Sequence, residues 1–219
     1  IRPGGASEVD HAFLEARELS APAHDDEALF RAQRGLWLQS LQRGVTAETR
    51  QHAQANMQVA ARIGTRPVIG EASRCLAMAL WLQGHLQAAR NHMDYAIACM
   101  PAAYFLEHKG VHDPAWGSDC MNASSLIYWQ LGYPDEALRR SIEGLDVNRA
   151  LQLPLASAVA LEFVSLVYAM LDQPINAGKA ADELIAVSRK YGFLTHVELG
   201  RMLKGWALAA RGFARKGIP

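Results

Sequence analysis

The chain has 219 residues, 50% of them apolar, so it can bury a sizeable core, and its 22 basic side chains balance 22 acidic ones. That balance leaves no strong net field to attract nucleic acid or an anionic membrane surface. The sequence shows no secretory signal and no apolar run near the ~18 residues of a membrane span, which predicts a soluble, cytoplasmic protein.

Helix-forming residues dominate and alternating β-branched runs are missing, so the chain is predicted to be all-α. We expect a lone helix over residues 7–20, opened by Ser7. Helical hairpins should follow over residues 26–63, 67–100, 114–151 and 155–191. A last helix, capped by Thr195 and Glu198, should open a partial repeat over residues 196–219.

A helix-ending turn recurs along the chain every 40 residues, apart from a single spacing of 48. Its central residue is one that accepts a left-handed backbone: Gly44, Gly84, Gly132, Asp172 and Gly212. Pro134 and Pro174 stand where a second helix begins, because the missing N–H of proline has no bond to lose there. A fixed period of this length indicates stacked helical hairpins.

Small residues occupy matched positions on the two helices of each expected hairpin. They are Ala77, Ser125, Ser165 and Gly205 before the turns, and Ala89, Ala137 and Ala177 after them. Small side chains at facing positions let antiparallel helices approach closely. We therefore predict a right-handed α-solenoid, a single repeat domain over residues 1–219. Both ends fall part-way through a repeat, so we expect a fragment of a longer array.

The pattern resembles a tetratricopeptide repeat. The second hairpin resembles it best, with small, large, turn, small, large, small and proline positions at Ala77, Leu80, Gly84, Ala89, Met93, Ala96 and Pro101. The period exceeds the ~34 residues that are usual for this motif. A longer period is typical of the elongated variety found in large bacterial signalling proteins.

Longer segments resemble the C-terminal repeat region of bacterial predicted ATPases. They include the turns "HDP" and "LGYPDEAL" and the segment "KGWALAARG". Such proteins often carry a class III adenylate/guanylate cyclase domain or a DNA-binding domain. No phosphate-binding loop of the G-x-x-x-x-G-K-[ST] type is present here. The resemblance therefore implies a non-catalytic regulatory module without a cofactor. It would bind a protein, a peptide or a small effector and signal to attached nucleotide-binding or cyclase domains.

In tetratricopeptide arrays the first helix of each hairpin lines a concave face. Registering these helices on their turns places three sets of residues on that face. They are Trp81 and Trp129; Met78, Leu126, Leu166 and Trp206; and Arg74, Asn122, Glu162 and Met202. An aromatic and methionine-rich strip with a few polar groups suits an amphipathic helix or an extended peptide. The alternative is that the tryptophans pack between hairpins as core.

The link between the second and third hairpins, residues 101–120, collects His108, His112 and Asp113. Two histidines four residues apart can ligate a metal when they share a helix face, but the intervening Gly110 argues against a helix. Three interpretations stay open: a structural link with Asp113 as a helix cap, part of a ligand pocket, or an enzymatic or metal site. The first is favoured, and no metal is expected.

Three cysteines, Cys75, Cys99 and Cys120, lack the spacing of a zinc site and are expected to be buried free thiols. Acidic side chains gather over residues 7–27 and basic ones over residues 187–219. This asymmetry leaves a second function open, a scaffold that self-associates through its ends without any effector. Nucleic acid is not an expected partner, because no helix-turn-helix signal or dense basic stripe is present.

Overall fold

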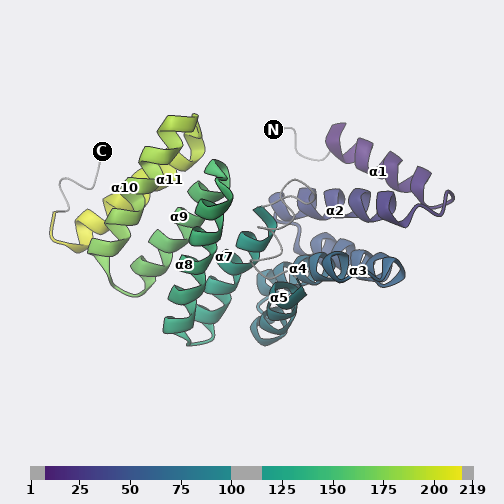
Figure 1. Ribbon diagram of the computed structural model, residues 1–219, viewed down its shortest axis with the longest axis horizontal. Coiled ribbons are helices and arrows are strands. Elements are labelled where there is room, and N and C mark those ends of the chain that lie inside the picture. Colours follow the sequence, from purple (N-terminus) through teal and green to yellow (C-terminus); the bar gives the residue numbers. More distant parts are fainter. Residues whose placement is uncertain (1–7, 100–114, 214–219) are drawn as a thin grey trace. The chain divides into compact units, whose positions relative to one another are not determined.

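The computed structural model describes residues 8–99 and 115–213. Within them the chain is built from helices, without strands (Figure 1). The helices are α1 (Glu8–Ser20), α2 (Asp26–Gln42), α3 (Thr46–Ile63), α4 (Arg66–Leu82), α5 (Leu86–Cys99), α7 (Ala115–Gln130), α8 (Pro134–Leu151), α9 (Pro154–Met170), α10 (Pro174–Tyr191) and α11 (Leu194–Ala210). The predicted all-α fold is confirmed. None of the helices in this described part is both long and apolar enough to cross a membrane.

The helices gather into two compact units, residues 1–100 and residues 101–219. The first unit contains α1 to α5, and the second contains α7 to α11. The division falls at the start of the link that produces the single long repeat spacing. One repeat domain over the whole chain therefore stays a prediction.

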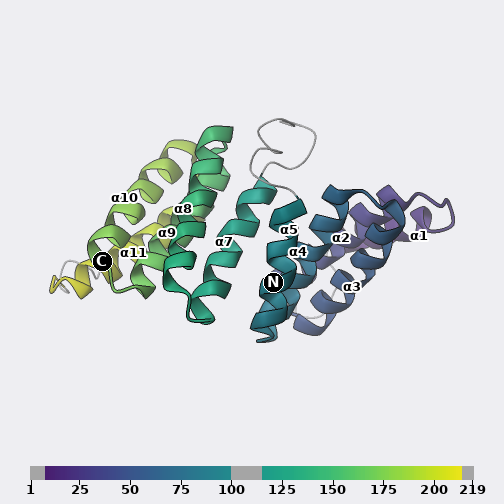
Figure 2. The ribbon, with the colours of Figure 1, turned by 60° about the horizontal axis from the view of Figure 1, so that its bottom comes forward.

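Antiparallel hairpins pair consecutive helices: α2 with α3, α4 with α5, α7 with α8, and α9 with α10 (Figure 2). Their bounds lie within one residue of those expected. The turn residues have a left-handed backbone, as predicted, with φ of 71° at Gly44, 79° at Gly84, 84° at Gly132, 54° at Asp172 and 84° at Gly212. At one such turn the N–H groups of Gly84 and His85 donate to the Trp81 and Leu80 carbonyls, each at 2.9 Å. These bonds satisfy the carbonyls at the end of α4.

The start of α11 differs from the prediction. The helix begins one residue before Thr195, and its N-cap is Phe193, so Thr195 and Glu198 are not a capping pair. The cause is Gly192, which ends α10 with φ of 77° and lets the Phe193 N–H bond the Ser188 carbonyl at 2.9 Å. The chain has therefore already turned when it reaches Thr195. The other expected cap, Ser7, lies outside the described residues.

Matched small residues set the spacing inside the hairpins. Ser165 and Ala177 are fully buried, and the Ser165 hydroxyl donates to the Ala177 carbonyl at 2.9 Å. The corresponding residues of two other hairpins are also fully buried: Ala77, Ala89, Ser125 and Ala137. The first hairpin departs from this pattern. Trp37 of α2 stands at the position where the first helices of the other hairpins have a small residue. Its indole N–H donates to the Cys75 carbonyl of α4 at 3.2 Å, so Trp37 joins two hairpins.

The core of the second unit runs through four helices. Leu145 of α8, Leu161 and Val164 of α9, Leu184 of α10 and Leu203 of α11 form one buried cluster. Burying a Leu or Val side chain contributes roughly 1.5–3 kcal/mol, so each helix depends on its neighbours for most of its stability.

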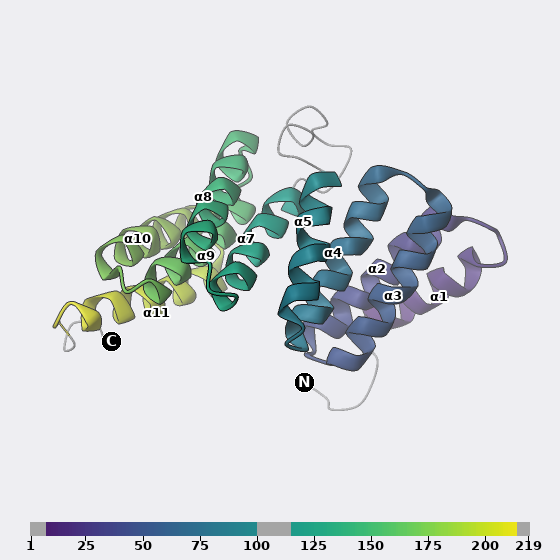
Figure 3. The same cartoon turned by 90° about the horizontal axis from the view of Figure 1, so that it is seen from below.

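Within each unit, the first helices of successive hairpins lie closer together than the second helices do. In the first unit α2 contacts α4, and in the second α7 contacts α9, which contacts α11. Among the described residues, the second helices α3 and α5 do not contact each other, and neither do α8 and α10. Figure 3 shows α4 lying between α3 and α5. Each unit is therefore narrower on its first-helix side and splayed open on its second-helix side.

Candidate functional site

The polar set predicted for the concave face packs mostly inward. The Arg74 guanidinium is buried and lies 5.1 Å from the ring centre of Trp37. The Glu162 carboxylate lies 3.4 Å from His196 Nδ1 and so joins α9 to α11. Asn122 is 1% exposed, and in the described part of the chain its side-chain amide has no hydrogen-bond partner. Arg74 and Glu162 contact neighbouring helices and Asn122 is buried, so the three do not form an open polar surface.

The fourth member of that set is different. Met202 of α11 is 63% exposed. Trp206 lies one turn further along the same helix and is also exposed. Together they leave part of α11 open to solvent.

The predicted apolar sets stay partly open. Trp81, Trp129, Met78 and Leu166 are half-buried, and Leu126 is buried. These half-buried side chains are partly covered and partly exposed, so a role of the tryptophans in a binding groove stays a prediction. Leu38 of α2 belongs to the same set, because it precedes its turn by as many residues as Met78 does, and it is exposed. Its distance from the turn residue Gly44 would have been enough to include Leu38 in the predicted set. In the first unit we call Leu38, Met78 and Trp81 its first-helix strip, and in the second unit Trp129, Leu166, Met202 and Trp206 are its first-helix strip.

Sequence reasoning missed Trp37, Arg34 and Glu71. Arg34 of α2 forms an ion pair with Glu71 of α4, close in sequence to the Trp37 and Arg74 contact between the same two helices. Both contacts fasten successive first helices to one another. No local signal marks them, because each pair lies nearly a full repeat apart in the sequence.

The candidate residues of the link, His108, His112 and Asp113, lie outside the described residues. Within residues 8–99 and 115–213, no group of three or more His, Cys, Asp or Glu side chains could hold a metal ion. The three cysteines are buried free thiols, as predicted. Burial raises the pKa of the Cys75 thiol to about 12, so Cys75 stays protonated and unreactive at neutral pH.

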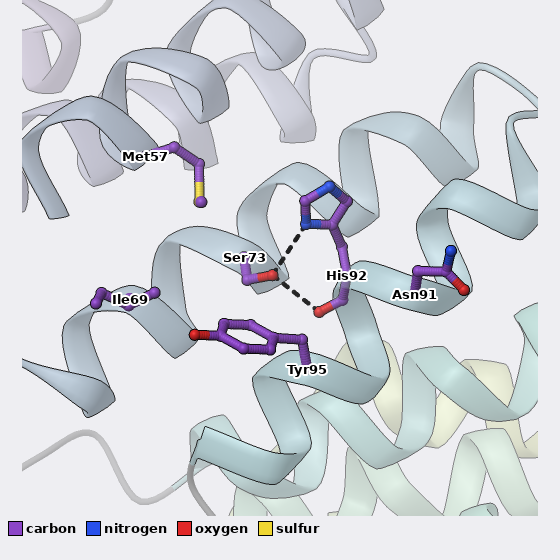
Figure 4. Close-up of a pocket in the computed structure, with 6 residues that line it drawn as sticks. All are labelled: Met57, Ile69, Ser73, Asn91, His92 and Tyr95. Atoms are coloured by element: carbon purple, nitrogen blue, oxygen red, sulfur yellow. Dashed lines mark hydrogen bonds between the residues drawn. The ribbon is translucent and has the colours of Figure 1, made fainter. Parts of the chain in front are cut away.

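A pocket of about 330 Å³ opens on the second-helix side of the first unit, where α3 and α5 splay apart over α4. Six residues line it: Met57 from α3, Ile69 and Ser73 from α4, and Asn91, His92 and Tyr95 from α5. Figure 4 shows Met57 and His92 on opposite sides, with Ser73 between them. The sequence did not predict this pocket, because it depends on the gap between two helices about a repeat apart.

Ser73 and His92 are joined by two short contacts. The Ser73 hydroxyl donates to the His92 carbonyl at 3.0 Å, and Ser73 Oγ lies 3.1 Å from His92 Nδ1 (Figure 4). Ser73 is 0% exposed, and its hydroxyl hydrogen is used in the bond to a backbone carbonyl. Burial lowers the pKa of His92, which is therefore neutral at neutral pH.

A related pair stands one repeat earlier. Gln33 Nε2 lies 2.5 Å from His52 Nδ1, and these residues precede Ser73 and His92 by 40 positions each. Burial also lowers the pKa of His52. The two hairpins thus share a partly buried polar contact between their helices.

A second hollow of about 510 Å³ runs along α8. It is lined by Arg139, Ile142, Glu143, Asp146, Val147 and Ala150. Arg139 hydrogen-bonds Glu136 and Glu143. The bond from Arg139 to Glu136, with a further one from Arg140, lowers the pKa of Glu136 to about 2. The charged side chains bond one another along the helix, so this surface is a solvated helix face.

No protein-family model matches the chain, and no curated protein matches it either. Solved structures are similar to it over most of its length. One is the kinesin light chain-like TPR repeat protein of Podosopora anserina, with a TM-score of 0.65 and 15% identity over 85% of this chain and 89% of that one. Another is BtubC (BKLC) from P. vanneervenii, with a TM-score of 0.74 and 15% identity over 95% of this chain and 84% of that one.

The fold is that of a tetratricopeptide-like repeat solenoid. At such low identity the likeness concerns the fold alone. It confirms the tetratricopeptide-like resemblance, whereas the likeness to the repeat region of cyclase-associated ATPases stays a prediction.

Proposed function

We propose that this tetratricopeptide-like chain is a non-catalytic protein-interaction module that binds an amphipathic helix or an extended peptide through the first-helix strip of a single unit. The observation that carries the proposal is the pattern of exposure. Polar side chains at first-helix positions are engaged with neighbouring helices, while Met202 and Trp206 stay exposed beside half-buried Trp129 and Leu166. Exposed aromatic and methionine side chains are common anchors of peptide-binding surfaces.

A regulatory role extends this proposal. The module would work in the cytoplasm and pass the bound state to attached nucleotide-binding or cyclase domains. A ligand can do so only if it binds one spacing of the first helices more tightly than another. Contacts that span neighbouring first helices, such as Glu162 with His196 and Arg34 with Glu71, are the ones such a ligand would tighten or loosen. A small effector on the same strip would act by the same route.

Site-specific photo-crosslinking tests the binding face. A photoreactive amino acid replaces Met202 on the first helix α11, and a matched control replaces Ile175 on the second helix α10. These side chains are 63% and 57% exposed, so their access to solvent is similar. We expect a discrete crosslinked partner from the Met202 position after irradiation in host cells, and none from Ile175.

Crosslinks of equal yield from both positions would contradict the proposal, because they would report exposure rather than recognition. A crosslink from Ile175 alone would place the partner on the second-helix side. Circular dichroism of both variants checks that each keeps the parent's helix content.

Self-association is a second candidate, favoured by one observation. Leu194 is 78% exposed, and Met202, Trp206 and Phe213 are exposed along the same helix and its end. Exposed apolar side chains of this kind suit a second copy as well as a partner. In that case the Met202 crosslink would have twice the mass of the chain. Contact between the acidic and basic ends would also make association weaken with salt in sedimentation experiments.

A further inference from the structure

The pocket between α3 and α5 is not used by the proposed function. The two residues that α4 contributes to its lining, Ile69 and Ser73, are not members of the first unit's first-helix strip. The polar and apolar groups of the pocket determine which ligands it can bind. One determinant is which ring nitrogen of His92 carries the proton.

The hydrogen bonds of Ser73 fix that proton. The Ser73 hydroxyl has a single hydrogen but makes two contacts, to the His92 carbonyl at 3.0 Å and to His92 Nδ1 at 3.1 Å. Both contacts are satisfied only when Ser73 donates to the carbonyl and accepts from a protonated Nδ1. The neutral His92 ring then has its lone pair on Nε2, the nitrogen on the far side of the ring from Ser73 (Figure 4). Nε2 is therefore a hydrogen-bond acceptor on a residue that lines the pocket.

The rest of the lining is apolar or uncharged. Met57 and Ile69 supply aliphatic and thioether surface, and the Tyr95 ring supplies an aromatic face (Figure 4). No carboxylate, ammonium or guanidinium group is among the six lining residues, so nothing in the lining compensates a charged ligand. A volume of about 330 Å³ is within the range of small-molecule and side-chain pockets.

We propose that this pocket binds an uncharged aromatic ring that carries an N–H, the chemistry of indole and of a tryptophan side chain. The ring lies between Met57, Ile69 and Tyr95, and its N–H donates to His92 Nε2. Sulfur and aromatic contacts with Met57 and Tyr95 favour a flat ring over an aliphatic group of the same size.

His52 provides a natural control. It holds the same hairpin position as His92, but its contact is the Gln33 amide nitrogen, which donates to His52 Nδ1. The single N–H proton of the neutral His52 ring is therefore on Nε2. Nε2 of His52 is a donor and does not accept a hydrogen bond from an N–H group. His52 does not line the pocket.

The first test needs no ligand. Nitrogen-15 NMR of the full chain distinguishes the two neutral tautomers of each histidine. We expect His92 to carry its proton on Nδ1 and His52 on Nε2. Finding the His92 proton on Nε2 would overturn the proposal.

The second test titrates the full chain with indole, N-methylindole and N-acetyltryptophanamide, following the methyl signals of Met57 and Ile69. We expect indole to shift both signals to saturation and N-methylindole, which lacks the N–H, to bind at least about tenfold more weakly. Exchange of His92 for Phe should abolish this preference, and exchange of His52 for Phe should keep it. If either variant loses helicity, two measurements on the unmodified chain still test the proposal. They are the comparison of indole with N-methylindole and the assignment of the His92 tautomer.

The titration also separates the two sources of the ring. Binding of N-acetyltryptophanamide as tightly as indole identifies a tryptophan of a partner protein, and binding of indole alone identifies a free small molecule. Equal affinity for indole and N-methylindole would overturn the proposal, as would saturation without shifts at Met57 and Ile69 or no binding by any of the three.

Discussion

His52 and His92 occupy the same position in consecutive hairpins, and their protonation affects the free energy of unfolding. Burial lowers the pKa of both below the ordinary 6.5. Arg17 and Arg43 lower that of His52 further, while Glu48 opposes them. The unfolded chain therefore takes up protons at a higher pH than the folded chain does. Acidification favours unfolding for this reason.

We expect the free energy of unfolding to be constant above the unfolded pKa of about 6.5 and to fall as the pH drops through the lowered pKa values. Urea denaturation at a series of pH values measures this slope. His52→Gln and His92→Gln should each make the slope shallower. An unchanged slope in both variants would contradict the assignment. The carboxylate of Glu136, with a pKa of about 2, titrates in a separate and more acidic range.

Gln152 carries backbone strain that its counterparts avoid. It links α8 to α9 with φ of 57°, whereas Gly64 and Gly192 occupy the matched links with φ of 74° and 77°. A non-glycine residue in the left-handed backbone region costs about 1–2 kcal/mol. Glycine removes this cost, but it loses more conformational entropy on folding, so the net gain is smaller. Gln152→Gly should raise the free energy of unfolding by about 1 kcal/mol. Gly192→Gln should lower it by a similar amount, and a shift of both variants in the same direction would contradict this account.

At the scale of elements, helix separation depends on where a side chain is missing. α10 and α11 approach each other at Gly200, where an added Cβ would lie 2.7 Å from Ile185 Cγ1 and 3.3 Å from Leu184 Cγ. Gly178 of α10 has more room, since its added Cβ would lie 3.4 Å from Ala207 Cβ. The two glycines therefore serve the same helix pair under different steric limits.

Gly200→Ala should lower the free energy of unfolding by about 1 kcal/mol, because overpacking outweighs the gain in helix propensity. Gly178→Ala should change it little or raise it by up to about 1 kcal/mol. Thermal denaturation of both variants checks the difference. Equal effects would show that propensity, and not the packing of α11, governs both positions.

At the scale of the whole molecule, helical repeats gain stability mainly from their nearest neighbours. Trp37 illustrates this, because its N–H bonds the next hairpin and its ring lies against Arg74 of that hairpin. The two compact units follow from the same rule, since each contains its own contacts between first helices. In the proposed function a partner on the first-helix strip of one unit would bind across neighbour contacts of this kind, and the Met202 crosslink tests the strip of the second unit directly.

The sequence by itself determined the repeat. Its glycines, prolines and small residues act over one or two helical turns, so the all-α class, the hairpins and the left-handed turn residues could be predicted from local rules. The start of α11 was wrong, because the Phe193 bond to Ser188 completed the turn before the expected cap.

Only the tertiary structure decided exposure and chemistry. Asn122 and Arg74 have the register of surface residues, yet neighbouring helices cover them. The pocket of His92 exists because α3 and α5 splay apart over α4, and its acceptor nitrogen depends on a hydroxyl 19 residues away. Burial and proton position depend on what other elements bring near a side chain, whereas turns and helix ends depend on the chain's own backbone.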